Sequence, residues 1–72
     1  MEARGTTIRR LREEAGYGLN RFADRVGISP SWLSRIERNK SKHPAPEVLK
    51  RIADGLEHPV TDIADFGKEN PE

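Results

Sequence analysis

The sequence contains no cysteine, which excludes a disulfide framework and a metal site built on thiolates. Aromatic residues are also few, at 6% of the chain, and Leu, Ile, Val and Phe together supply only 15 of its 72 residues. So small a hydrophobic core must be held by close helix packing or by a partner. A chain of this length is expected to form one compact domain and not a multidomain enzyme.

Long apolar runs are absent as well, since the longest are only two or three residues. We therefore expect neither a membrane-spanning segment nor a signal peptide, and a reducing, cytoplasmic setting is favoured. No stretch alternates polar and apolar residues as a strand would, no segment repeats at a fixed period, and no linker divides the chain. The expected fold class is all-α.

Charge is distributed unevenly along a chain whose formal net charge is only +1. Residues 1–42 contain 10 Lys or Arg and 5 Asp or Glu, whereas residues 43–72 contain 3 and 7. This division favours a polyanion-facing surface built by the basic first part of the chain. The alternative is that the arginine-rich helices are simply well solvated.

Three helices are predicted in the first part of the chain. Apolar residues recur at helical spacing over 8–15 and over 19–26, and a glycine closes each stretch. The third helix starts at Ile28-Ser29-Pro30, which combines an apolar staple, a capping serine and a proline suited to the first helical position. It is expected to run to about Arg38.

Only Gly27-Ile28-Ser29 separates the second helix from the third. So short a connection forces a sharp corner, the helix-turn-helix arrangement, whose second helix can enter the major groove of DNA. Corner hairpins also occur in proteins that never contact DNA. The residues on the exposed face of the third helix therefore indicate whether this hairpin binds DNA or not.

The rest of the chain predicts a basic loop over 39–44 and two further helices. Pro46 suits the opening turn of a fourth helix, and Pro59 can open a short fifth helix that carries apolar residues as far as Phe66. The expected architecture is a compact bundle of five helices.

The third helix turns Leu33 and Ile36 into the interior when it is read at about 100° per residue. Side chains opposite them or on the flanks are the candidates for reading DNA bases: Ser31, Trp32, Ser34 and Arg35. Arg35 has a planar guanidinium that can bond O6 and N7 of one guanine together. Trp32 either contacts a thymine methyl or a sugar, or packs on a neighbouring helix, which is the favoured reading.

Phosphate contacts are expected from polar and basic residues around the third helix and the loop after it: Arg21, Ser29, Arg38, Asn39, Lys40, Lys42 and His43. Such contacts set the register of a protein on DNA without reading its sequence. Ser29 either bonds a phosphate or serves wholly as the cap of the third helix, and the cap is favoured.

Three blocks of sequence resemble the Cro and lambda-repressor-type helix-turn-helix family, also called the XRE family. They are Gly5–Gly16 (GTTIRRLREEAG), Phe22–Glu37 (FADRVGISPSWLSRIE) and Leu49–Leu56 (LKRIADGL). The resemblance implies a five-helix, DNA-binding transcriptional regulator of bacterial or phage origin, such as a repressor. It also implies a homodimer on a near-palindromic double-stranded operator, read by the third helix.

The same resemblance implies an ion pair between Arg12 and Glu37, partly buried, that ties the first helix to the end of the third. The helical count agrees with this, since it places Glu37 on the inward face, where a carboxylate needs a partner.

The chain also departs from the family pattern. In relatives the second helix commonly opens with Ser or Asn followed by a Gln that bonds a phosphate, whereas here Gly18 and Leu19 occupy those positions. Asn20, Arg21 or Tyr17 would have to replace that contact. At the end of the fourth helix, Glu57 stands where a glycine is common.

Enzymatic chemistry is not expected. Adjacent Glu13 and Glu14 diverge by about 100° on a helix and do not face each other as an acid and base pair. His43 and His58 lack the spacing and the companions of a metal site. No serine is accompanied by a base, and no glycine-rich phosphate loop is present, so neither a catalytic residue nor a cofactor is predicted.

The alternative function is an antitoxin-type protein-interaction module on the same scaffold, with DNA binding secondary. In that case the acidic, partly apolar stretch over 60–66 would bind a protein partner. In the alternative, the same stretch is only the fifth helix and covers the core. We expect one domain over 1–66, a flexible C-terminal tail over 67–72, and no membrane partner. The chain is either a whole protein or an N-terminal domain.

Overall fold

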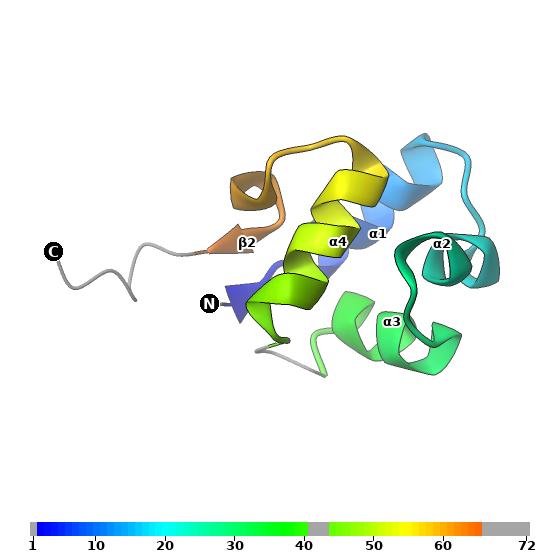
Figure 1. Ribbon diagram of the computed structural model, residues 1–72, viewed down its shortest axis with the longest axis horizontal. Helices are drawn as coiled ribbons and strands as arrows, with labels where there is room; N and C mark the ends of the chain where they lie inside the picture. The colour runs from blue at the N-terminus through cyan, green and yellow to red at the C-terminus, as the bar shows by residue number, and fades with distance from the viewer. Residues whose placement is uncertain (1, 41–43, 66–72) are drawn as a thin grey trace, which may run out of the picture.

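The computed structural model describes residues 2–40 and 44–65, which form four α-helices, one short 3-10 helix and a pair of two-residue strands (Figure 1). In chain order they are β1 (Glu2–Ala3), α1 (Gly5–Glu14), α2 (Leu19–Val26), α3 (Pro30–Glu37), α4 (Pro46–Leu56), η1 (Val60–Asp62) and β2 (Ala64–Asp65). The four main helices predicted from hydrophobic periodicity are confirmed.

The chain differs from the prediction after α4. The expected fifth helix is only the 3-10 turn η1, and β2 follows it and pairs antiparallel with β1, with Ala3 opposite Ala64. The Arg4 amide extends this pairing by donating to the Ile63 carbonyl at 2.8 Å. Strands of two residues are too short to show alternation, so the all-α expectation missed them. Phe66 and the tail over 67–72 lie outside the described residues.

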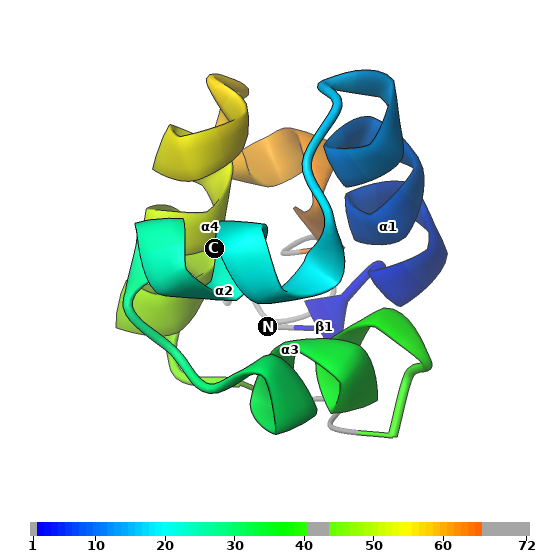
Figure 2. The same cartoon turned by 90° about the vertical axis from the view of Figure 1, so that its right-hand side faces the viewer.

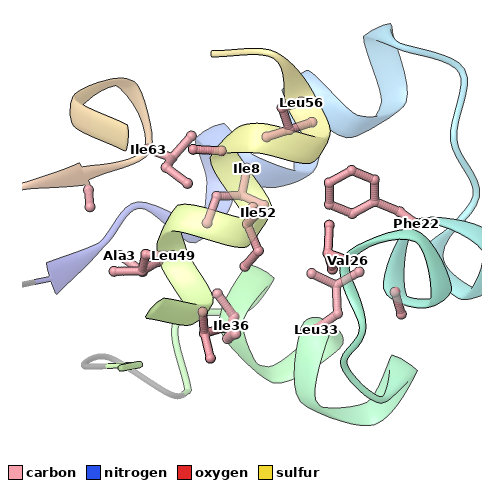
Figure 3. Packing of buried hydrophobic residues seen from close by; sticks show 14 residues of the cluster. Ala3, Ile8, Phe22, Val26, Leu33, Ile36, Leu49, Ile52, Leu56 and Ile63 are labelled. Atoms are coloured by element: carbon pink, nitrogen blue, oxygen red, sulfur yellow. The ribbon is translucent and has the colours of Figure 1, made fainter. Parts of the chain in front are cut away.

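The core collects apolar side chains from every helix. Figure 3 shows them pointing into one interior between α1, α2, α3 and α4. The largest of the fully buried side chains are Ile8, Phe22, Leu33, Ile36, Leu49, Ile52 and Ile63. No large hydrophobic side chain is fully exposed in the described part of the chain. Burial of this cluster is the main favourable term that holds the fold.

The corner between α2 and α3 is built by the predicted signals. Gly27 ends α2 with a left-handed φ of +79°, and the amides of Gly27 and Ile28 both donate to the Ala23 carbonyl, at 2.9 and 3.0 Å. Ser29 then caps α3, because its hydroxyl oxygen accepts from the Trp32 amide at 3.1 Å. Figure 2 shows the result, with α3 crossing below α2.

Helix α1 begins directly against the end of α3. The Gly5 amide donates to the side-chain oxygen of Asn39 at 3.1 Å, while Asn39 holds a left-handed φ of +62° just after α3. Asn39 thus supplies the cap that Arg4, the residue before α1, does not provide. A Cβ on Gly5 would collide with the carbonyl oxygen of Ile36 and lie 2.6 Å from that of Glu37.

The end of α4 adopts a conformation that usually belongs to glycine. Glu57 has a left-handed φ of +61°, and the His58 amide donates to the Ala53 carbonyl at 3.0 Å. Glu57 therefore replaces the glycine that is common at this position, but the backbone of the turn after α4 keeps the conformation that a glycine would adopt.

Replacing Gly5 by alanine is expected to destabilise the domain by about 1–3 kcal/mol, since a backbone carbonyl cannot rotate away from the added methyl group. Urea unfolding measures the change. Gly18→Ser is the matched control, because Gly18 precedes α2 with an extended backbone and open space around it. A serine cap there is expected to stabilise by a few tenths of a kcal/mol, roughly. Equal stability of Gly5→Ala and wild type would contradict the close approach of α1 to α3.

Candidate nucleic-acid interface

Helix α3 has one face inside the protein and one face in solvent. Leu33 and Ile36 are completely buried, whereas Ser31, Arg35 and Arg38 are exposed. The orientation predicted for this helix is confirmed, and the base-reading role of its outer residues stays a prediction. Ser34 is half-buried on the flank of the same face.

The structure also locates Trp32 and Ser29. Trp32 is half-buried and packs against the core, as the structural alternative for this residue expected. Ser29 is exposed and its oxygen caps α3, which confirms the favoured role. The hydroxyl hydrogen of Ser29 can still donate to an acceptor outside the protein.

A buried ion pair joins α1 to α3. Arg12 donates from Nε to one carboxylate oxygen of Glu37 at 2.7 Å and from Nη2 to the other at 3.1 Å. Its Nη1 donates to the Tyr17 carbonyl at 2.8 Å, so the same guanidinium also holds the turn before α2. Each of the paired residues is only 7% exposed. The hydrogen bond to Glu37 raises the pKa of Arg12 above its ordinary value, and the charged form is therefore held.

Apart from Ser29, the candidate phosphate-binding residues fall into three groups. Arg21, Arg38 and Lys40 are exposed near α3 or the start of α2. Asn39 is exposed too, but its side-chain oxygen already accepts from the Gly5 amide, so the NH₂ group is the part of this side chain that can donate to a phosphate. Lys42 and His43 lie outside the described residues.

Two shallow depressions adjoin each other beside the outer face of α3. One, of about 350 Å³, is lined by Leu19, Pro30, Ser31, Ser34, Arg35 and Arg38. The other, of about 290 Å³, is lined by Arg9, Arg12, Leu19, Ser34, Glu37 and Arg38. They share Leu19, Ser34 and Arg38, so together they form one hollow, which we call the α2–α3 hollow.

Three residues of this hollow were not predicted as site residues: Arg9, Leu19 and Pro30. Arg9 belongs to the polar side of α1, where an exposed arginine is typical of any solvated helix. Leu19 fits the apolar spacing of α2, and that spacing gives no sign that the side chain also lines a surface. Only the packing of α1 and α2 against α3 shows that the side chains of Arg9 and Leu19 reach the same surface. No three His, Asp or Glu side chains of the described residues gather as a metal site.

The match to known proteins covers nearly all of the chain. Residues 5–66 match the family described as "Helix-turn-helix domain". The chain belongs to this family. The predicted resemblance to the Cro and lambda-repressor-type branch is confirmed by the relatives and structures that follow.

Among its relatives, this helix-turn-helix domain is similar to three bacterial transcriptional regulators. It is 43% identical to SutR of Escherichia coli over 56 residues, which are 78% of this chain and 31% of SutR. It is 38% identical to SlrR and 34% identical to SinR of Bacillus subtilis, each over 61 residues and 85% of this chain. The aligned regions are 40% of SlrR and 55% of SinR. The chain therefore spans about a third to a half of the length of these relatives.

Solved structures show the same arrangement of helices. The crystal structure of SinR in complex with DNA superposes with a TM-score of 0.76 at 35% identity, covering 79% of this chain and 90% of that chain. The SinR–SinI complex gives 0.82 at 32% identity, covering 96% and 67%. The DNA-binding domain of the P22 c2 repressor, at 23% identity and a TM-score of 0.76, covers 83% and 78% and shares the fold. Across the described ranges, the helix-turn-helix domain has no helix with the length and apolar character to cross a bilayer.

Breaking the Arg12–Glu37 pair from one side is expected to cost about 3–5 kcal/mol of folding free energy, because Glu37→Ala leaves a buried guanidinium without its partner. The double variant Arg12→Met with Glu37→Leu removes both charges and is expected to recover most of that loss. Urea unfolding of the two proteins measures the difference.

The exposed Arg9–Glu13 pair, 3.1 Å apart, is the matched control. Glu13→Ala is expected to change stability by less than about 0.5 kcal/mol, because an exposed pair on one helix contributes little. A double variant less stable than Glu37→Ala would refute the assignment of the cost to an unpaired buried charge. This comparison stays informative if Glu37→Ala does not fold.

Proposed function

We propose that this domain binds double-stranded DNA sequence-specifically as part of a bacterial or phage transcriptional regulator, with α3 in the major groove. The observation that supports this proposal most directly is the exposed outer face of α3, which carries Ser31 and Arg35. The corner between α2 and α3 holds this helix in place. SinR, which adopts the same fold at 35% identity, has been crystallised in complex with DNA, and this supports the proposal.

The charge distribution supports the same surface. Arg9 and Arg10 of α1 lie beside carboxylates four residues away, at 3.1 and 3.8 Å, and Arg12 is buried with Glu37. By contrast, no carboxylate that the structure describes lies within 4.0 Å of Arg35, Arg38 or Lys40. Cations without a carboxylate partner are the ones available to an anionic ligand, and three of those that the structure describes lie on α3 or just after it.

The proposed roles divide the side chains into those that contact bases and those that bind phosphates. Arg35 reads a guanine through its bidentate guanidinium, and Ser31 and Ser34 contact base edges near it. Trp32 contributes apolar contact from the part of its ring that the core does not cover. Arg21, Ser29, Arg38, the Asn39 amide and Lys40 bind phosphates and set the register on the duplex. Lys42 and His43 are proposed for the same task on sequence grounds.

The regulator is proposed to act as a repressor in the cytoplasm, on nucleoid DNA, and as a homodimer on a two-fold symmetric operator. All of the named relatives are bacterial transcriptional regulators. A dimer predicts two half-sites about 10 bp apart, one helical turn of DNA.

A second candidate function is protein binding through the end of the chain, with DNA binding secondary. The solved SinR–SinI complex, which aligns with 96% of this chain, supports this candidate, because it shows a similar scaffold in complex with a protein. The two candidates differ in a simple measurement, since a DNA-binding regulator holds a defined duplex when purified alone.

Selection of binding sites from randomised duplex DNA tests the proposal. The purified protein is expected to enrich a two-fold symmetric motif that contains a guanine. Arg35→Ala is expected to lose about 1–3 kcal/mol of discrimination at that guanine alone, because only the bidentate contact disappears. Lys40→Ala, the matched control, should weaken binding to all sequences alike. Loss of all binding by the wild type, or unchanged preference in Arg35→Ala, would refute the proposal.

Salt dependence gives an independent measure of the phosphate contacts. If about five phosphates are neutralised per subunit, log affinity should fall with log salt at a slope of roughly −4 to −5 per subunit. Fluorescence anisotropy with a labelled duplex measures this slope. Lys40→Ala should make it shallower by about one, whereas a flat dependence in the wild type would rule out the electrostatic contacts.

A further inference from the structure

Leu19 occupies an unusual place in the α2–α3 hollow. It is the first residue of α2, it is half-buried, and part of its side chain packs against the core. It also lines both depressions that make up the hollow. The remaining exposed surface of Leu19 therefore lies on the side of the domain that is proposed to face DNA.

The neighbours of Leu19 in the hollow are mostly polar or charged. Ser34 and Arg38 line both depressions with it, and Ser31 and Arg35 complete the wall formed by α3. Pro30 is the other apolar residue of the lining, at the start of α3. Leu19 thus adds an apolar surface to a hollow whose lining from α3 carries hydrogen-bond donors.

This combination favours one feature of the DNA major groove. Charged phosphates gain nothing from a leucine side chain, which has no hydrogen-bond donor. The apolar group that B-DNA presents in the major groove is the C5-methyl of thymine, and apolar side chains contact it. Leu19 and Arg35 line the same depression, so the contact would fall next to the base read by Arg35.

We propose that Leu19 reads the C5-methyl group of a thymine adjacent to the guanine bound by Arg35, and so acts as a specificity-determining residue. The inference rests on the proposed function, since it needs α3 in the major groove. It gives the first residue of α2 a role in sequence recognition, in addition to its packing on the core.

The test replaces each thymine of the selected duplex, one at a time, by deoxyuridine, which lacks only the methyl group. One thymine per half-site is expected to weaken binding about fourfold on substitution, the change that loss of one buried methyl group gives. Placing 5-methylcytosine there should bind better than cytosine, because it restores the methyl.

The protein variant that tests the assignment is Leu19→Ala. It is expected to bind the thymine and the deoxyuridine duplex equally, while Arg35-dependent preference for the neighbouring guanine persists. Leu11→Ala is the matched control, since Leu11 is also a half-buried leucine packed on the core but does not line the hollow. That control should keep the full thymine preference.

Two results would overturn the inference. If every deoxyuridine duplex binds as the parent does, the wild-type protein makes no methyl contact. If Leu19→Ala retains the fourfold preference, another residue makes it. In both cases Arg35-dependent binding would persist and the proposed function would stand, whereas absence of any selected duplex refutes the proposed function itself. The deoxyuridine scan needs only the wild-type protein, so a scan without any weakened duplex overturns the inference even if Leu19→Ala fails to fold.

Discussion

The geometry of the domain depends on the buried pair of Arg12 and Glu37. Hydrophobic burial has no preferred direction, and a core built from so few large side chains would allow α3 to slide or rotate over its neighbours. The guanidinium bonds both oxygens of the carboxylate and the Tyr17 carbonyl, so one side chain fixes α1, the turn before α2, and α3. A buried charge tolerates few other arrangements, because separation would leave it unpaired.

A second polar link lies at the opposite end of α1. The Gly5 amide bonds Asn39, and the absence of a side chain on Gly5 lets α1 approach the last carbonyls of α3. Helix α3 is thus held near its end by two directional contacts from one neighbour. This rigidity matters for a surface whose proposed task is to present Arg35 to a base edge, since such contacts need side chains placed to within a fraction of an ångström, roughly 0.5 Å.

The sequence was most informative where a local rule decides the structure. Gly27, Ser29 and Pro30 define the corner between α2 and α3 through backbone conformation and capping, and both operate within a few residues. Helical periodicity likewise placed Leu33 inside and Arg35 outside. The Arg12–Glu37 pair, which the family resemblance implied, is also present in the structure.

The sequence was least informative where distant segments meet. The same proline at 59 is compatible with an α-helix or with the observed 3-10 turn, and pairing of β1 with β2 joins the two ends of the described chain without any local signal. Asn39 was predicted to face phosphate because its loop is basic, yet its oxygen bonds α1. Leu19 is half-buried and lines a surface, and its apolar spacing is the same as that of a wholly enclosed leucine, so periodicity does not separate the two cases.

The C-terminal end of α4 is a place where a substitution can make this domain more stable. Glu57 adopts a left-handed backbone conformation, which costs a non-glycine residue about 1–2 kcal/mol. The last turn of α4, just before Glu57, contains Asp54 and no basic residue. Negative charge there opposes the helix dipole. Since Glu57 lines neither part of the α2–α3 hollow, the thermal stability of the domain can change at this turn without a change in the surface that is proposed to bind DNA.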